Sequence, residues 1–245
     1  MIDDPRGRDG LVPDGSTSDP DPFAPELVPN DGGSGDPTRQ LDDETVNETG
    51  TTTIGIATED GVVIATDKRA SLGGRFVSNK DVQKVEQIHP TAALTLVGSV
   101  GGAQSLIRTL RSEASLYGTR RGEDLSIPAL ATFAGNVMRG GPFVRNHPVL
   151  GGVDEDAGHV YSIDGAGGVL EDDYVVTGSG TQLAYGAIEG EYDPELSLEE
   201  AVTLAARGVH AATERDTGSG NGIYVAQVTA DGVDIEDYDD VAALL

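Results

Sequence analysis

The chain has 245 residues, no cysteine and a formal net charge of −26, from 42 acidic and 16 basic side chains. The absence of cysteine excludes disulfides, thiol catalysis and cysteine-based zinc sites, and so acidic a surface repels the phosphates of nucleic acids and anionic membranes. Acids dispersed along the chain, with only three lysines, favour a protein kept in solution at high salt. No stretch approaches 18 apolar residues and no signal-peptide pattern opens the chain, so we expect a soluble, cytoplasmic protein.

Residues 1–50 differ in composition from everything after them. They contain 13 acids, seven of the 12 prolines and seven glycines, without helical or strand periodicity. Such a segment cannot bury enough apolar surface to fold alone, so we predict a disordered leader. It is either a solvating tail or a removable propeptide, and the two are compatible. Residues 51–245 are long enough for one domain with a sizeable core.

The first half of this domain predicts strands followed by two helices. Short runs of β-branched residues between turn residues predict the strands, and the turn at 59–61 makes the first two a hairpin. Apolar residues at helical spacing, and a serine and a proline suited to a helix start, predict the helices. In chain order, strands are expected over 52–57, 62–66, 82–88 and 92–99, and helices over 103–117 and from Ser126, with Pro128 in the first turn.

The second half repeats this order. A capping box at 197–200 predicts the start of the last helix. In chain order, we expect strands over 160–163 and 174–177, a short helix after Thr181, a helix from Ser197, and strands over 223–228 and 233–235. The economical architecture is an α+β, four-layer αββα sandwich, in which two antiparallel sheets lie face to face and each is flanked by helices.

The junction between leader and domain reads Thr-Gly-Thr-Thr-Thr-Ile-Gly over residues 49–55. Scission after Gly50 would give Thr51 a free α-amine with a pKa of about 8, so one residue would supply both a nucleophilic hydroxyl and its base. A threonine in such a run is otherwise an ordinary β-former. Asp67 ends the returning strand of the hairpin, and strand pairing places that end beside Thr51.

Further short segments follow this junction in a specific order, although each alone is an ordinary turn or strand. They are 65–69, Lys84, 97–101, 151–154, 161–164, 177–180 and 214–222. Together with Gly50–Gly55, they resemble the archaeal proteasome β subunits, which are N-terminal-nucleophile (Ntn) hydrolases. The likeness covers nearly all of 51–235 and is strongest to haloarchaeal β subunits, in agreement with the acidic composition.

The resemblance implies an Ntn-hydrolase fold and a threonine endopeptidase that cuts itself between Gly50 and Thr51, without cofactor or metal. It assigns Thr51 as the nucleophile and Lys84 as a buried lysine whose ammonium, paired with Asp67, favours the alkoxide. It makes the Gly98 N–H the oxyanion donor. The network expected around the terminal amine consists of Ser179, Asp216 and Ser219.

The resemblance also implies a pocket for the side chain before the scissile bond. Its apolar lining would give a chymotrypsin-like preference, although Glu86 is expected near the rim. The substrate would bind as an extended strand along Ser71, which stands where many β subunits have threonine, and along Gly98–Val100. The expected lining residues are Ala70, Val82, Leu96 and Val100.

By resemblance, β subunits form stacked seven-membered rings capped by α-subunit rings, through which a regulatory ATPase delivers unfolded proteins. Three alternatives remain: a non-catalytic structural β-type subunit, a bacterial two-ring threonine protease, and a salt-adapted binding domain without chemistry. The long leader argues against the two-ring enzyme, whose leader is normally minimal. Inactive subunits typically lose the terminal threonine or the lysine, and both Thr51 and Lys84 are present.

Overall fold

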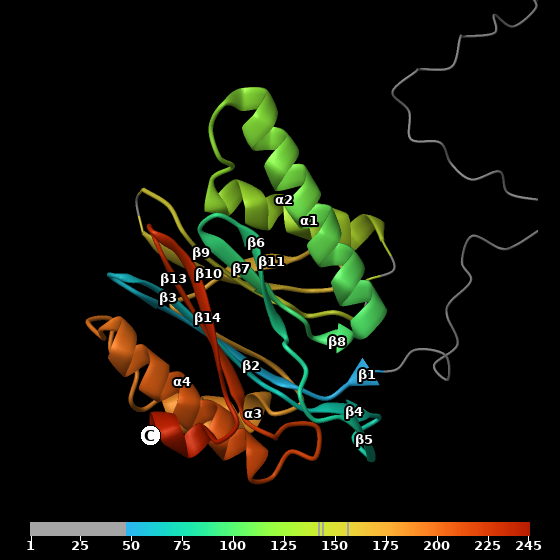
Figure 1. Ribbon diagram of the computed structural model, residues 1–245, viewed down its shortest axis with the longest axis vertical. Helices are drawn as coiled ribbons and strands as arrows, with labels where there is room; N and C mark the ends of the chain where they lie inside the picture. Colours follow the sequence, from blue (N-terminus) through green and yellow to red (C-terminus); the bar gives the residue numbers. More distant parts are fainter. Residues whose placement is uncertain (1–47, 142, 144, 156) are drawn as a thin grey trace, which may run out of the picture. The chain divides into compact units, whose positions relative to one another are not determined.

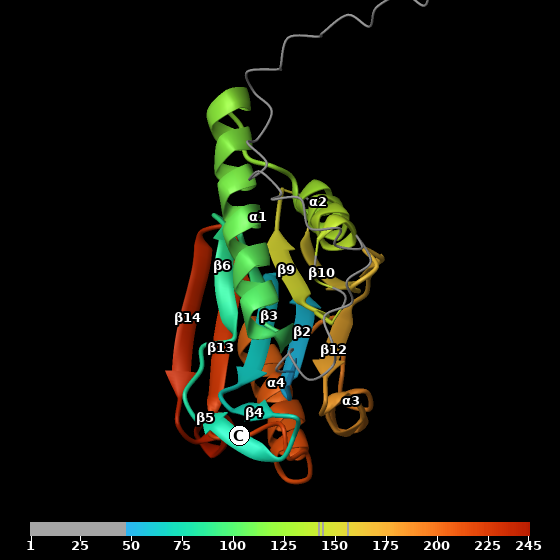
Figure 2. The same ribbon diagram turned by 90° about the vertical axis from the view of Figure 1, so that its right-hand side faces the viewer.

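The computed structural model describes residues 48–141, 143, 145–155 and 157–245, which all belong to one compact unit, Leu41–Leu245. Most of the predicted leader, residues 1–47, lies outside the described residues. The α+β sandwich predicted from the sequence is confirmed. Two antiparallel sheets are stacked in the middle, with one pair of helices on each outer face (Figures 1 and 2).

One main sheet carries the predicted hairpin at its centre. Its strands follow the order β12 (Tyr174–Gly178), β2 (Thr52–Thr58), β3 (Gly61–Asp67), β13 (Ile223–Thr229) and β14 (Gly232–Tyr238). The hairpin turns between Thr58 and Gly61 and pairs Thr53 with Thr66. This register confirms the predicted return of the chain, because it brings Asp67 back to the start of β2.

The other main sheet contains two strands that the sequence did not predict, β9 and β11. Its order is β11 (Val169–Glu171), β10 (Gly158–Ile163), β9 (Val149–Val153), β7 (Ala92–Thr95) and β6 (Val85–His89). Strand β9 was not predicted because it contains two glycines, which have low strand propensity. Both lie where the layers approach closely: a Cβ on Gly151 would lie 2.7 Å from Val62, and one on Gly152 would lie 2.8 Å from Ile127.

Three apolar layers fill the spaces between the four layers of secondary structure. Alternation along β3 separates two of them, because successive side chains of a strand point to opposite faces. Val62 and Ile64 lie between the two sheets, whereas Val63 and Ala65 pack toward the outer helices α3 (Thr181–Ile188) and α4 (Leu198–Thr213). The third layer lies between the second sheet and the helices α1 (Val100–Arg121) and α2 (Ile127–Gly140).

A third, small sheet was not predicted. It has the order β5 (Phe76–Asn79), β4 (Ala70–Leu72), β1 (Glu48–Thr49) and β8 (Gly98–Ser99). The single strand expected over 92–99 was wrong, because β7 ends at Thr95 and Gly98, with φ of +91°, directs the chain into the small sheet. The expected strand over 82–88 likewise begins only at Val85. One of the two inner strands of the small sheet, β1, belongs to the end of the predicted leader.

The helix ends follow local capping. Helix α1 begins three residues before its predicted start because the Ser99 side chain accepts a hydrogen bond from the Gly102 amide, and it ends at the left-handed Gly122. The predicted capping box of α4 is present at Ser197 and Glu200. Ser126 is the N-cap of α2 but its side chain makes no capping bond. Among the helices of the described residues, none has the length and apolar character that crossing a bilayer requires.

Candidate active site

The hydroxyl of Thr51 lies at the centre of a buried polar cluster. It donates a hydrogen bond to Asp67 Oδ1 at 2.9 Å and accepts one from Lys84 Nζ at 2.8 Å. Lys84 Nζ also lies 2.8 Å from Asp67 Oδ1, so the three predicted groups contact one another pairwise. The hairpin supplies Thr51 and Asp67, and the residue just before β6 supplies Lys84.

Backbone amides hold the Asp67 carboxylate from the other sides. Its Oδ1 accepts from the Thr52 amide at 3.0 Å, and its Oδ2 accepts from the amides of Arg69 at 3.0 Å and Gly220 at 2.8 Å. Charge-assisted bonds of this kind are stronger than neutral ones and fix the position of the acceptor. The carboxylate therefore stays in place independently of the lysine.

Lys84 has an unusual protonation equilibrium. Its side chain is almost fully buried, and this burial lowers its pKa below the ordinary 10.5 even though Asp67 opposes the shift. A buried ammonium with one carboxylate partner retains its proton less firmly than an exposed one. The Lys84 ammonium can thus donate a hydrogen bond to the Thr51 hydroxyl, and it loses its proton at a lower pH than a surface lysine does.

The backbone nitrogen of Thr51 lies at one end of a hydrogen-bond chain formed by the three predicted network residues. It donates to Ser179 Oγ at 3.1 Å, and the Ser179 hydroxyl donates to Asp216 Oδ2 at 2.6 Å. The Ser219 hydroxyl lies 2.6 Å from the same carboxylate oxygen. Ser179 therefore contacts the nitrogen that scission would convert into an amine, and Asp216 and Ser219 connect to it through Ser179.

Arg69 is a residue of this region that the sequence reasoning missed. Its Nε donates to Asn221 Oδ1 at 2.9 Å and its Nη1 donates to the Thr217 carbonyl at 3.1 Å. These bonds fix the loop that carries Ser219 and Gly220. The sequence signal was its place directly after Asp67 and Lys68, but nothing in that motif indicates the loop as its partner.

The end of the predicted leader lies beside Thr51, where Gly50 lines a cleft together with Gly98, Ser179 and Gly218. Strand β1 pairs with β4 on one side, Thr49 opposite Leu72, and with β8 on the other, Thr49 opposite Gly98. Gly50 then fits tightly, because a Cβ there would lie 2.5 Å from the Gly218 Cα. Such a distance requires a shift of backbone, so the position demands glycine.

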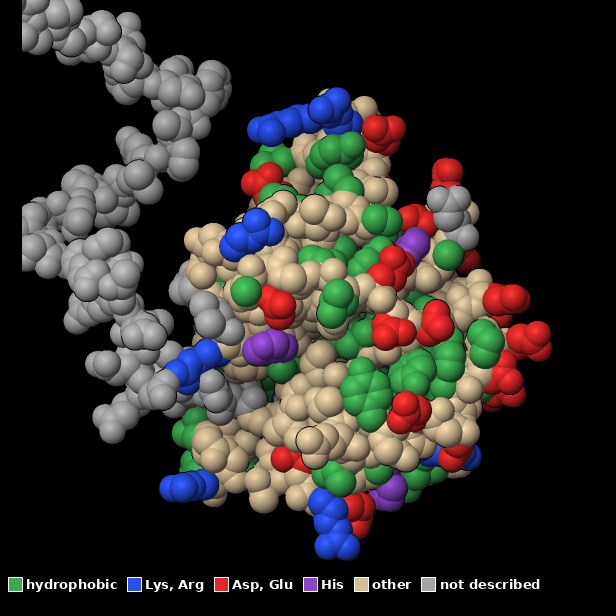
Figure 3. Space-filling view, turned by 180° about the vertical axis from the view of Figure 1, so that it is seen from behind, with side chains coloured by type: hydrophobic (Ala, Val, Ile, Leu, Met, Phe, Trp, Pro, Cys, Tyr) green, Lys and Arg blue, Asp and Glu red, His purple; other side chains and the backbone are tan. Residues whose placement is uncertain are grey.

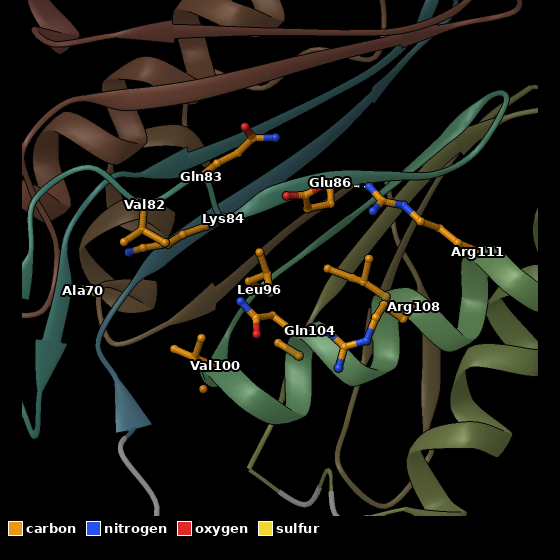
Figure 4. Close-up of a pocket in the computed structure, with 13 residues that line it drawn as sticks. Ala70, Val82, Gln83, Lys84, Glu86, Leu96, Val100, Gln104, Arg108 and Arg111 are labelled. Carbon is orange, nitrogen blue, oxygen red and sulfur yellow. Dashed lines mark hydrogen bonds and ion pairs between the residues drawn. The ribbon is translucent and has the colours of Figure 1, made fainter.

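A cavity of about 270 Å³ opens next to Lys84 (Figure 4). Its lining includes the four predicted apolar residues, namely Ala70, Val82, Leu96 and Val100. Ser71, also predicted to contact substrate, lies in β4 with a buried hydroxyl that has no hydrogen-bond partner among the described residues. Val100 is the first residue of α1, and the sequence reasoning missed the other residues that this helix adds to the wall, namely Ala103, Gln104, Ile107, Arg108 and Arg111.

Glu86 lines the cavity, and Arg111 neutralises it. Arg111 Nη2 lies 2.7 Å from Glu86 Oε2, and its Nε donates to the Gln87 carbonyl at 2.5 Å. Figure 4 shows this pair at the end of the cavity away from Val82 and Val100. The cavity thus combines the four apolar side chains near Lys84 with the Glu86–Arg111 pair and a second arginine, Arg108, farther away.

Outside the cleft, the surface is acidic. Figure 3 shows carboxylates scattered over one face, with lysines and arginines mainly toward its periphery. No group of three or more His, Asp or Glu side chains within 48–141, 143, 145–155 and 157–245 is placed to hold a metal ion.

Comparison with known proteins places this geometry in a family. The sequence signature described as "Proteasome subunit" matches residues 47–228. The "Proteasome subunit beta" of Halorhabdus utahensis is 67% identical over 227 residues, which cover 92% of this chain and 94% of the relative. The "Proteasome subunit beta 2" of Haloterrigena turkmenica is 66% identical over 238 residues, which cover 96% of this chain and 98% of the relative.

The "Proteasome subunit beta 1" of Haloarcula marismortui is 67% identical over 219 residues, and the match covers 89% of each chain. These relatives come from halophilic archaea, in agreement with the acidic composition. The match to the family signature spans well over half of the chain, and the relatives match over nearly their whole length. The chain therefore belongs to the proteasome subunit family, as a β subunit of the haloarchaeal type.

Proposed function

We propose that this chain is a catalytic β subunit of a proteasome core particle, a threonine endopeptidase that becomes active when it cuts itself between Gly50 and Thr51. The observation that carries the proposal is the contact of the Thr51 hydroxyl with both Lys84 and Asp67. The pairing of residues 48–49 with β4 and β8, just before the proposed scissile bond, supports it.

In the first cut, Thr51 Oγ attacks the carbonyl carbon of Gly50. The bond from that carbon to the Thr51 nitrogen breaks, the nitrogen takes up the hydroxyl proton, and an ester joins Gly50 to Thr51. Water then hydrolyses the ester, which releases a leader ending in a Gly50 carboxylate and restores the hydroxyl. The nitrogen is an amide before the cut and cannot act as base, so this step depends on Lys84 and Asp67 alone.

In peptide hydrolysis, the free amine of Thr51 takes the proton of its own hydroxyl as the oxygen attacks the substrate carbonyl. The Lys84 ammonium stabilises the developing alkoxide, and the Gly98 N–H donates to the oxyanion. The amine then protonates the leaving nitrogen and later activates the water that hydrolyses the acyl ester. Ser179, Asp216 and Ser219 orient the amine through the hydrogen bonds described above.

The pairing of β1 is a template for the substrate. A peptide that replaces Glu48–Thr49 would lie as a middle strand between β4 and β8, held by backbone hydrogen bonds on both sides. The side chain before the scissile bond would enter the cavity beside Lys84. Because its near wall is apolar and Glu86 is paired, we propose a chymotrypsin-like preference.

This preference is tested by unpairing Glu86. In Arg111→Ala, the released carboxylate should raise cleavage after lysine and arginine relative to cleavage after leucine or tyrosine by about tenfold, which is the effect of an uncompensated charge in a pocket. The control is Arg120→Ala, which removes an arginine from the far end of the same helix. Equal preference in both variants, or a wild type that favours charged residues, would contradict an apolar site with a neutralised Glu86.

The proposal extends to assembly. We propose that the chain joins other β subunits in stacked heptameric rings capped by α-subunit rings in the cytoplasm, and that a regulatory ATPase feeds unfolded proteins through the α ring. Native mass spectrometry of co-expressed α and β chains checks this. Particles with seven copies of each chain per half agree with it, and a monomeric mature β chain that hydrolyses peptides on its own does not.

The catalytic role is tested by Thr51→Ala. This variant should assemble but retain the leader, and its peptidase activity should fall below a hundredth of the wild-type value, because neither nucleophile nor base remains. Labelling of the wild type by a threonine-directed epoxyketone, located on Thr51 by mass spectrometry, separates this proposal from a structural subunit. Assembled wild-type particles that take up no label would favour the structural role.

A further inference from the structure

Asn146 is buried beside Gly98, and neither the sequence motifs nor the roles proposed above include it. The amide group of its side chain donates to two backbone carbonyls, Val97 O at 2.7 Å and Ser99 O at 3.1 Å. Val97 and Ser99 are the residues on either side of Gly98, and the Val97 carbonyl shares a peptide unit with the Gly98 N–H. Because both partners can only accept, they also determine which end of the side-chain amide faces them.

The first of these bonds acts on the peptide unit that contains the proposed oxyanion donor. The Val97 carbonyl and the Gly98 N–H belong to one planar trans peptide, so they point in opposite directions. Fixing the carbonyl therefore fixes the direction of the N–H. A donor that polarises the carbonyl also strengthens the hydrogen bond that the N–H of the same unit can make.

In the precursor, Gly98 also pairs with Thr49 of β1, but that strand would leave with the leader. The φ of Gly98, +91°, lies in a region that glycine enters freely, so its flanking peptides could rotate without a side chain to resist them. The backbone of 145–146 packs directly against Gly98, because a Cβ there would lie 2.0 Å from the Arg145 carbonyl oxygen. The same segment thus blocks one face of Gly98 and supplies the Asn146 amide.

Helix α1 leaves space for this arrangement. A Cβ on Gly102, in its first turn, would lie 2.7 Å from Asn146 Oδ1, so a larger residue there would displace the amide. Asn146 is 1% exposed, and its Oδ1 has no hydrogen-bond partner among the described residues. Both amide hydrogens of Asn146 are used, whereas its buried oxygen is not. We infer that the side chain serves as a hydrogen-bond donor at this position.

We propose that Asn146 is a positioning residue for catalysis, which aims the Gly98 N–H at the oxyanion by clamping the carbonyls of the residues on either side of it. This rests on the proposed function of Gly98. Asn146 does not touch the substrate, so its loss should weaken binding of the transition state while ground-state binding stays nearly constant.

The test uses mature, assembled particles, with rates expressed per Thr51 labelled by an epoxyketone, so that incomplete processing does not count as slow chemistry. In Asn146→Ala, kcat should fall about 10- to 100-fold, somewhat less than the 10²–10³ expected when an oxyanion donor is lost outright. KM should change by less than about twofold. Affinity for a peptide aldehyde, whose adduct places an oxygen at Gly98, should fall in parallel with kcat.

Thr95→Val is the matched control. Thr95 is also buried, and its hydroxyl accepts a hydrogen bond from the Val149 amide at 2.8 Å, away from Gly98. It should lose comparable stability with kcat and aldehyde affinity unchanged. Asn146→Asp, which has nearly the same volume but no donors, replaces Asn146→Ala if that variant fails to assemble, and it should lose at least as much activity.

The proposal is overturned if both Asn146 variants retain kcat and aldehyde affinity within about twofold, or if Thr95→Val loses as much as they do. That outcome differs from a failure of the proposed function, in which the wild-type particle itself would neither hydrolyse peptides nor take up the epoxyketone.

Discussion

Two of the three lysines in this chain are buried, but the groups around them differ. Lys84 faces one carboxylate, Asp67, and the Thr51 hydroxyl, and burial lowers its pKa. Burial also acts to lower the pKa of Lys68, but hydrogen bonds to Asp239, Asp81 and Asp237, at 2.9, 3.0 and 3.1 Å, outweigh it and raise the pKa. Burial alone therefore does not identify a reactive lysine. The charged groups around the lysine determine whether its pKa is lowered or raised.

The carboxylates explain the difference. Asp67 is itself fully buried, so the Lys84 pair stands almost alone in a region of low dielectric. The three partners of Lys68 are 56–97% exposed and remain hydrated while they contact one ammonium. Lys68 thus joins the end of β14 to the segment before β6, in a chain where basic partners for surface acids are scarce.

The largest expected effect is that of Lys84→Ala. Peptidase activity should fall about 10²- to 10⁴-fold, the range for a positioned group in proton transfer. The fold should survive, because Asp67 retains hydrogen bonds from the Thr51 hydroxyl and from three backbone amides. Lys80→Ala, at the exposed third lysine, is the control. Normal activity in Lys84→Ala would remove Lys84 from the proposed mechanism.

Lys68→Met should affect stability and leave chemistry intact. Three carboxylates would lose their shared cation, which should lower the stability, but by less than the loss of a fully buried pair because the carboxylates can be hydrated. Molar salt should reduce this loss by screening their repulsion. Unfolding measured at low and high salt, with kcat per labelled site, checks the prediction. A loss of kcat at unchanged stability would reverse the roles of the two lysines.

The pH profile should separate the lysines a second time. Activity should rise about tenfold per pH unit below a pKa of about 8, as the Thr51 amine loses its proton. As the pH rises further, activity should fall again. This alkaline loss should occur at a pH lower than 10.5, because Lys84 becomes neutral as the pH passes through its lowered pKa. Lys68 keeps its charge there, because a raised pKa means that its ion pairs are lost only as pH rises through that higher value. Activity and the free energy of unfolding should be measured over the same pH range. A loss of both at the same alkaline pH would contradict this separation of the two lysines.

The smallest effect should come from removing one partner of Lys68. Asp239→Asn leaves two carboxylates in place, and exposed ion pairs contribute little, so the Tm should shift by less than about 2 °C. The matched change at the other lysine, Asp67→Asn, should abolish activity. A large Tm shift for Asp239→Asn would mean that the Lys68 cluster depends on that single pair.

The sequence predicted the hairpin and its consequence, because β-branched runs around a turn set the register and place Asp67 beside Thr51. It also identified Lys84, although only through resemblance, since no pattern separates Lys84 from Lys68 before the carboxylates are in place. Asn146 could not be found, because it acts on backbone carbonyls nearly 50 residues away, which leave no signature in side-chain identity. The small sheet could not be predicted for a related reason. Its strand β1 consists of two residues, Glu48–Thr49, which have no strand pattern.

N-terminal sequencing of purified, peptide-hydrolysing particles tests the central claim most directly. If the amine of Thr51 serves as its own base, the β chains must begin at Thr51. Particles that hydrolyse peptides at full rate while their chains still carry Gly50 on the Thr51 nitrogen would contradict it, because an amide cannot accept the proton.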